Sequence, residues 1–178
     1  MLFLLLIAAS LAPAYRVDPS ASTIKYTVVH KLHRVDAASK QVEGKVVIRD
    51  DGEVLTEMRA PVMSFLSGDG NRDEHMAEVL EVGKYPLVVF KAAARLGSEG
   101  RLPAGELPID GQVDLHGVKK TYRIPLTISP QQDGSLHVKG SFDVSLDAHH
   151  VERPSLLFVK IDDACHLDVD LVLLRQQP

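Results

Sequence analysis

The chain has no tryptophan and only one cysteine, Cys165, among its 178 residues. One cysteine cannot form an internal disulfide, so the simplest interpretation of Cys165 is a small buried hydrophobic residue on a strand. Aromatic residues make up only 5% of the chain, which leaves Val, Ile, Leu and Ala as the bulk of its apolar side chains. An interior built from such modest side chains fills a wide space poorly.

The chain also lacks a strong excess of either charge, because 20 Lys and Arg residues are mixed along it with 24 Asp and Glu residues. A net charge of -4 provides no basic face of the kind that a phosphate backbone requires. Nucleic acid is therefore not expected as a partner.

The only long apolar run covers residues 2–9 and is followed by a small-x-small sequence that ends at Ala14. The run is too short for a bilayer-spanning helix, which needs about 20 apolar residues, and its ending matches a signal-peptidase site. We expect residues 1–14 to be a signal peptide and the mature protein to be periplasmic or secreted. Because no Lys or Arg precedes the run, an uncleaved tether or a misassigned start codon are the alternatives. Residues 15–178 suit one domain.

Alternation of apolar and polar residues, which is typical of half-buried strands, dominates after residue 20. Turns such as Asp133-Gly134 and His116-Gly117 place Gly where a hairpin needs positive φ. We therefore expect an all-β fold in the form of an antiparallel eight-stranded β-barrel, since closure removes exposed edges. A sandwich is the alternative. The predicted strands cover residues 24–30, 42–48, 54–62, 87–96, 107–115, 122–128, 136–146 and 165–173.

One segment breaks this alternation and predicts a short amphipathic helix over residues 71–82. Asn71 is the expected N-cap, with Glu74 as its reciprocal partner, and Gly83 is the expected C-terminal stop. The apolar stripe of the helix must cover something, and the mouth or flank of the barrel is the available surface. The residues at helical spacing are Met76, Val79 and Leu80.

Metal-binding and catalytic patterns are weak. His149 and His150 are adjacent and point apart on an extended chain, and no HExxH run or cysteine cluster accompanies them. Ser64 and Ser67 lie near a histidine and an aspartate in the sequence, but there is no GxSxG elbow. We expect no enzyme, no metal site and no cofactor, although a zinc or copper site assembled from distant histidines stays open.

Residues 72–75 have the sequence Arg-Asp-Glu-His, and after the predicted helix residues 84–90 have the sequence Lys-Tyr-Pro-Leu-Val-Val-Phe. These segments resemble the Arg-Asp-x-His and Lys-Tyr-Pro-x-x-x-Phe motifs of the YceI family of lipid-binding periplasmic proteins. Further similarity lies at residues 15–18, 42–44 and 115–120. The resemblance implies a lipocalin-like barrel that holds a long isoprenoid lipid, either a polyisoprenoid or the tail of an isoprenoid quinone, as a carrier or scavenger outside the cytoplasm.

The alternative is a packed, exported barrel without bound lipid, whose long basic loop at residues 31–40 contacts a partner. No protein partner can be named from the sequence. Brief contact with a membrane surface is compatible with a lipid carrier.

Within the lipid-binding interpretation, the phase of each strand suggests which side chains line the tunnel. His30, at a strand end, is expected at the mouth, where it can bond a head group. Arg72, Asp73 and His75 form a structural motif, in which Arg72 and Asp73 fix the helix to the barrel through a salt bridge or cap. Met76 and Leu80 provide a pliable apolar lid over the ligand. The predicted tunnel residues are Tyr26, Val28, Val46, Met58, Val88, Phe90, Ile124, Leu126, Phe142 and Val144.

Overall fold

The computed structural model describes residues 14–30, 33–95, 102–153, 155–156 and 159–176, and the proposed signal peptide lies outside this set except for Ala14. The strands of the main sheet are β1 (Ala14–Val17), β2 (Thr23–His30), β3 (His33–Ser39), β4 (Glu43–Ile48), β5 (Glu53–Pro61), β6 (Leu87–Arg95), β7 (Gly105–Leu115), β8 (Val118–Pro130), β9 (Leu136–Ser145) and β12 (Ala164–Arg175). The remaining elements are η1 (Val62–Ser64), α1 (Gly70–Val79), η2 (Asp147–His149) and the small hairpin of β10 (Ser155–Leu156) with β11 (Val159–Lys160).

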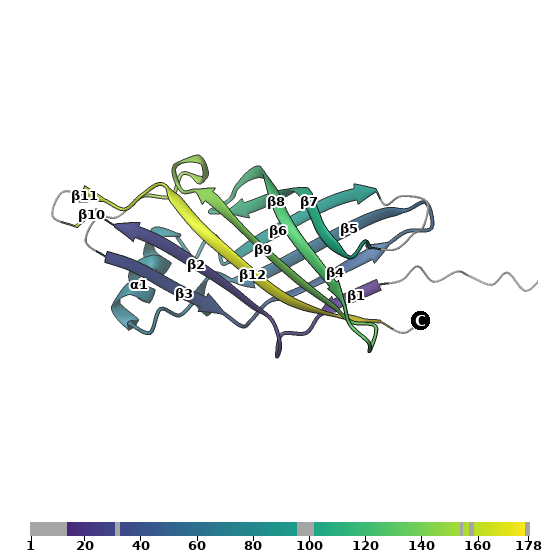
Figure 1. The fold of residues 1–178 in the computed structure, drawn as a ribbon. Helices are drawn as coiled ribbons and strands as arrows, with labels where there is room; N and C mark the ends of the chain where they lie inside the picture. Colours follow the sequence, from purple (N-terminus) through teal and green to yellow (C-terminus); the bar gives the residue numbers. More distant parts are fainter. Residues whose placement is uncertain (1–13, 31–32, 96–101, 154, 157–158, 177–178) are drawn as a thin grey trace, which may run out of the picture.

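The sheet closes into a barrel because β12 pairs with β1, and β1 pairs with β4. Strand β12 also pairs with β2, which follows β1 along the chain, so β1 and β2 are two segments of one long strand. Strands β3 and β4 are likewise two segments of its neighbour. The barrel therefore has eight antiparallel strands and one short helix, which confirms the predicted fold class. Figure 1 shows α1 at the end of the barrel beside β2 and β3, with the C-terminus towards the opposite end.

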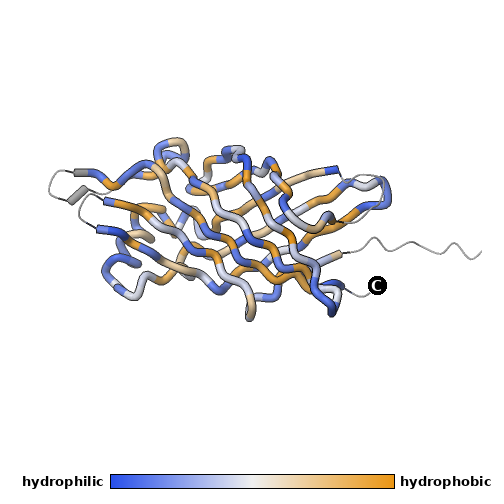
Figure 2. The backbone as a smooth tube through the Cα atoms, viewed as in Figure 1, coloured by the Kyte–Doolittle hydropathy of each residue, from blue (hydrophilic) through white to orange (hydrophobic). Residues whose placement is uncertain are grey.

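The alternation of apolar and polar residues is visible along the strands as alternating colours in Figure 2. The alternation predicts the inner face correctly: Val46, Val54 and Ile124 are at most 4% exposed. Cys165 is also buried, as predicted, and burial raises the pKa of its thiol to about 12. Within the described residues, no helix is both long and apolar enough to span a membrane.

Residues 33–39, predicted as a loop, instead form β3, which pairs with β2 from Ile24 opposite Ser39 to His30 opposite His33. The sequence pattern did not predict this strand, because its outward face carries charged residues. Asp36 accepts hydrogen bonds from Arg34 and from the Thr27 hydroxyl, and these bonds lower the pKa of Asp36.

The helix begins and ends earlier than the sequence predicts. Asp69, not Asn71, is the N-cap, and its carboxylate accepts hydrogen bonds from the backbone N–H groups of Asn71 and Arg72. The last helical residue is Val79 rather than residue 82. Glu81 adopts a left-handed φ of 47° and turns the chain away, so the stop precedes Gly83.

Two facing prolines interrupt the barrel wall. Pro108 on β7 lies opposite Pro125 on β8, and neither nitrogen can donate a hydrogen bond. The pair must therefore be of the non-hydrogen-bonded type, in which each nitrogen is directed away from the other, Pro108 towards β6 and Pro125 towards β9. The pairing of β8 with β9 starts only at Leu126 opposite Gly140. Before that point these two strands diverge.

Candidate ligand cavity

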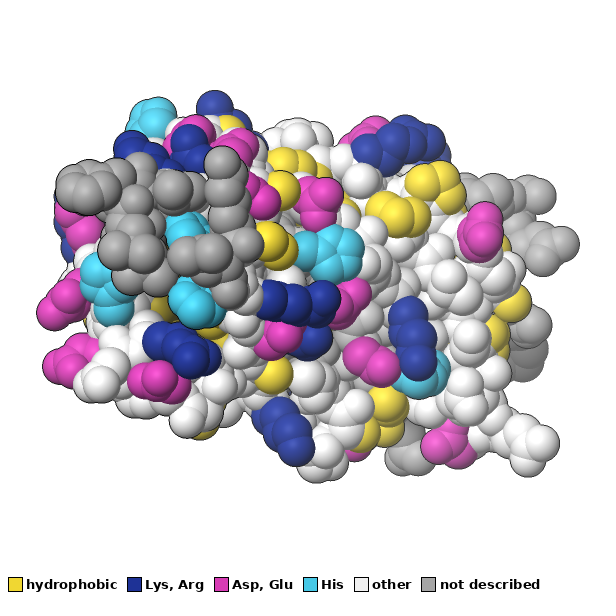
Figure 3. Space-filling model, turned by 60° about the vertical axis from the view of Figure 1, so that its left-hand side comes forward, with side chains coloured by type: hydrophobic (Ala, Val, Ile, Leu, Met, Phe, Trp, Pro, Cys, Tyr) yellow, Lys and Arg dark blue, Asp and Glu magenta, His cyan; other side chains and the backbone are white. Residues whose placement is uncertain are grey.

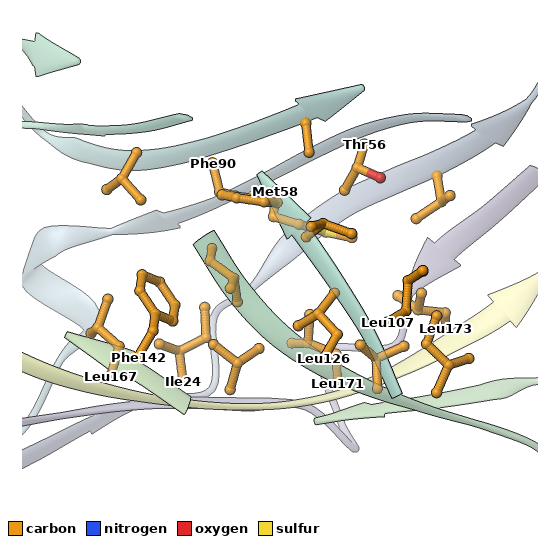
Figure 4. Close-up of a pocket in the computed structure, with 18 of the residues that line it drawn as sticks. Ile24, Thr56, Met58, Phe90, Leu107, Leu126, Phe142, Leu167, Leu171 and Leu173 are labelled. Atoms are coloured by element: carbon orange, nitrogen blue, oxygen red, sulfur yellow. The ribbon is translucent and has the colours of Figure 1, made fainter. Parts of the chain in front are cut away.

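An apolar cavity of ≈ 190 Å³, cavity 1, lies inside the barrel. Its lining comes from inward residues of nearly every strand of the barrel and is almost entirely aliphatic or aromatic. Figure 4 shows these side chains converging on the space from opposite walls, with Thr56 as the polar residue among those labelled. Arg59 and Arg95 also border the cavity. The labelled lining residues are Ile24, Thr56, Met58, Phe90, Leu107, Leu126, Phe142, Leu167, Leu171 and Leu173.

A second cavity of ≈ 270 Å³, cavity 2, lies at the end of the barrel beside α1, where residues of α1 and inward residues of β2, β3, β6, β7, β9 and β12 line it. Tyr26 lies in its lining, and burial raises the pKa of this phenol to about 12, so the hydroxyl stays neutral. The two cavities adjoin, because four residues line both of them: Phe65, Val88, Val113 and Leu167. Ligand pockets usually measure roughly 300–1,000 Å³, a range that the two cavities reach only together.

The interior stays hollow partly because large inward side chains lie across glycines of neighbouring strands. A Cβ atom at any of these glycines would overlap the larger side chain. Each large side chain therefore lies against the wall instead of filling the lumen. The three pairs are Met58 with Gly44, Phe90 with Gly111 and Leu126 with Gly140.

The ten predicted tunnel residues all lie in the walls of these cavities. Cavity 1 takes Val46, Met58, Val88, Phe90, Ile124, Leu126 and Phe142, and cavity 2 takes Tyr26, Val28, Val144 and again Val88. Met76 and Leu80 of the helix end line cavity 2, where a lid was expected. His30 is buried at the end of β2, stacked on His33, and is not among the lining residues of either cavity. Contact of these residues with a ligand stays a prediction.

The Arg72, Asp73 and His75 motif lies at the start of α1. Arg72 and His75 border cavity 2 and are exposed, and Arg72 pairs with Asp69 at 3.4 Å within the same turn. Asp73 instead accepts a hydrogen bond from the backbone N–H of Ser67, at 2.9 Å, and so ties the helix to the segment that precedes it. Figure 3 shows the molecule with the α1 end turned towards the viewer, and basic, acidic and histidine side chains are interspersed there.

Several lining residues escaped the sequence interpretation. Three inward residues of β12 line cavity 1, and the alternation along this strand could have predicted them: Leu167, Leu171 and Leu173. Phe65 lines both cavities from the segment between η1 and α1, and no periodicity marks it. Its ring packs against Tyr26 with 5.8 Å between centroids.

His149, weighed above as a metal ligand, closes the divergence between β8 and β9. Its ring is fully buried and stacks on Tyr122 of β8. Nδ1 lies 2.9 Å from the carbonyl oxygen of Val118, which can only accept, so Nδ1 carries the proton. The Tyr122 hydroxyl accepts a hydrogen bond from the backbone N–H of Ser145 on β9. Among the described residues, no three His, Cys, Asp or Glu side chains are grouped closely enough to hold a metal ion.

This placement predicts a pH dependence of stability. Burial has the largest effect on the pKa of His149 and lowers it, and the charge of Lys120 lowers it further. The Val118 and Leu115 carbonyls and the charge of Asp114 raise the pKa, but the net shift is downward. The native state then binds fewer protons at this site than the unfolded chain, so its stabilising effect is lost as the pH falls below the unfolded pKa of about 6.5.

Urea unfolding should therefore show a smaller free energy of unfolding at about pH 5 than at about pH 7.5, and the difference should shrink in His149→Phe. His150→Asn is the matched control, because residue 150 is exposed and has a φ of 57°, which Asn tolerates. Equal pH dependence in wild type and His149→Phe would show that His149 is not the responsible group.

An antiparallel barrel of eight strands, with an apolar hollow and a helix against one end, belongs to the lipocalin-like class of small β-barrels. The family within this class is given by the sequence. The profile of the YceI-like domain family matches residues 15–173, and the chain belongs to that family, as its motifs predicted.

Solved structures share the fold at low sequence identity. BcnA from Burkholderia cenocepacia superposes with a TM-score of 0.73 at 17% identity, covering 88% of this chain and 98% of its own. A polyisoprenoid binding domain from Saccharophagus degradans, implicated in plant cell wall breakdown, superposes with a TM-score of 0.72 at 19% identity, covering 92% and 98%. The YCEI protein of Campylobacter jejuni gives 0.64 at 13%, covering 84% and 90%. Among curated proteins, no match was found.

Proposed function

We propose that the protein binds a long isoprenoid lipid, either a polyisoprenoid or the tail of an isoprenoid quinone, and carries or scavenges it outside the cytoplasm. The observation that supports this most is the pair of adjoining apolar cavities within a YceI-like barrel. The likeness to a polyisoprenoid binding domain points to the same ligand class. The apolar run at residues 2–9 supports export.

Burial alone can hold such a ligand. Each methylene removed from water contributes about 0.8 kcal/mol, so affinity should rise with every isoprene unit until the cavities are full. Since the described lining of cavity 1 is almost entirely aliphatic or aromatic, we propose reversible binding without catalysis.

Organic extraction of the purified protein, followed by mass spectrometry, tests the proposal. We expect a polyprenyl species in stoichiometric amount. The delipidated protein should then take up an added polyprenyl quinone, and more weakly a quinone with a shorter tail. A protein that yields no lipid and takes up no polyprenyl quinone would favour the packed, partner-binding barrel instead.

A further inference from the structure

The backbone pairing between β6 and β7 covers only part of the two strands. These strands pair only from Val89 opposite Asp114 to Ala92 opposite Gly111. Continued in the same register, Ala93 would lie opposite Asp110, but no such pair forms, although both strands continue for several residues. Strand β7 keeps its full pairing with β8 over the same stretch, so the separation is confined to the β6 side.

Pro108 is a physical cause of this separation. Its nitrogen is directed towards β6, where continued pairing would place it opposite Arg95, and it has no proton to donate there. Where β8 and β9 are unpaired, the Tyr122 hydroxyl joins them by accepting a hydrogen bond from the Ser145 N–H, and the buried His149 ring stacks on Tyr122. Among the described residues, no side chain joins β6 to β7 in this way at Pro108, because Arg95 is exposed and pairs with Asp51 instead.

The residues of cavity 1 that flank the separation between β6 and β7 are all apolar except Arg95, whose exposed side chain pairs with Asp51 at 3.6 Å. Ala92 and Ala94 line the cavity from β6, and Leu107 and Ile109 line it from β7. Leu102, which precedes β7, also lines the cavity and packs partly buried against the core. Residues of the opposite phase, such as Ala93, are exposed.

We propose that this separation is a lateral portal through which the apolar tail of the ligand passes between cavity 1 and the outside. The inference rests on the proposed function and adds the route. A long flexible chain can slide sideways between flanks whose inward side chains are Ala92, Ala94, Leu107 and Ile109. Passage at the other end leads past α1, whose Met76, Val79 and Leu80 line cavity 2. In this proposal the Leu102 side chain blocks the portal, and the tail displaces it on passage.

Stopped-flow fluorescence with dansyl-labelled geranylgeraniol tests the route on the delipidated full chain. Ala94→Trp narrows the portal, and it should slow both association and dissociation, each by about tenfold, with a smaller change in the dissociation constant. Leu102→Ala should speed both rates. A side chain that merely occupied lumen space would accelerate dissociation and leave association unchanged. Ala93→Trp, one residue along β6 and facing outward, is the control and should leave both rates at the wild-type value.

Val79→Trp tests the other route, beneath α1. If Val79→Trp slows exchange while Ala94→Trp and Leu102→Ala leave both rates unchanged, the portal is overturned and the proposed function stands. If the wild-type protein takes up no geranylgeraniol probe at equilibrium, the proposed function fails, and the portal fails with it. Circular dichroism of each variant at the assay temperature establishes that the compared proteins are folded, and Leu102→Ala keeps the test decisive should Ala94→Trp not fold.

Discussion

Val28→Phe is expected to raise the dissociation constant for a polyprenyl ligand by about tenfold or more. Val28 lies on β2 opposite Cys165, and it lines cavity 2. A phenyl ring there takes the space of about two methylene groups of the ligand, which removes about 1.6 kcal/mol of burial. The extra bulk also strains the packing, at a cost of about 1–3 kcal/mol in the free energy of unfolding. Fluorescence titration gives the first quantity and urea unfolding the second.

The neighbouring residue supplies the matched control. Val29 is 42% exposed on the outer face of β2, so Val29→Phe should leave both affinity and stability near the wild-type values. Val144→Phe repeats the obstruction from β9, on the other side of Cys165. Unchanged affinity in Val28→Phe and in Val144→Phe would mean that the ligand does not occupy cavity 2.

Strand periodicity predicted most of the barrel because each wall residue faces either the lumen or water. The prediction failed where charge dominated the pattern, at β3. Asp36 and Arg34 face outward there while Ala37 and Ser39 are buried, so the strand has the usual alternation with short inward side chains. Small buried residues carry little hydropathy signal, and the charged face was interpreted as a loop.

The sequence predicted which side chains face the lumen, but it did not predict the shape of the cavity between them. Alternation places Val46, Met58 and Ile124 inward, but whether the lumen is filled or hollow depends on where those side chains lie. That depends on pairing between distant strands, such as Leu126 beside Gly140, which no local pattern contains. Phe65 reaches both cavities from an irregular segment for the same reason.

Gly111→Ala is expected to obstruct cavity 1 by moving a side chain on another strand. The added Cβ would overlap the Phe90 ring, which lies against the Gly111 backbone, and the ring is the only near neighbour that must move. Phe90 lines cavity 1, so the open space on that side is the lumen. We expect a loss of about 1–3 kcal/mol in the free energy of unfolding, together with a large loss of polyprenyl affinity.

A double-mutant cycle separates this effect from a general loss of stability. In a Phe90→Ala background, Gly111→Ala has no ring to displace, so the two substitutions should be coupled by about 0.5–3 kcal/mol, and adding Gly111→Ala should cost no further affinity. Gly134→Ala is the stability control: it strains a turn glycine with φ of 83° and nothing within 4 Å, and it should weaken folding without weakening binding. Additive effects of Gly111→Ala and Phe90→Ala would mean that the hollow does not depend on the Phe90 ring lying against Gly111.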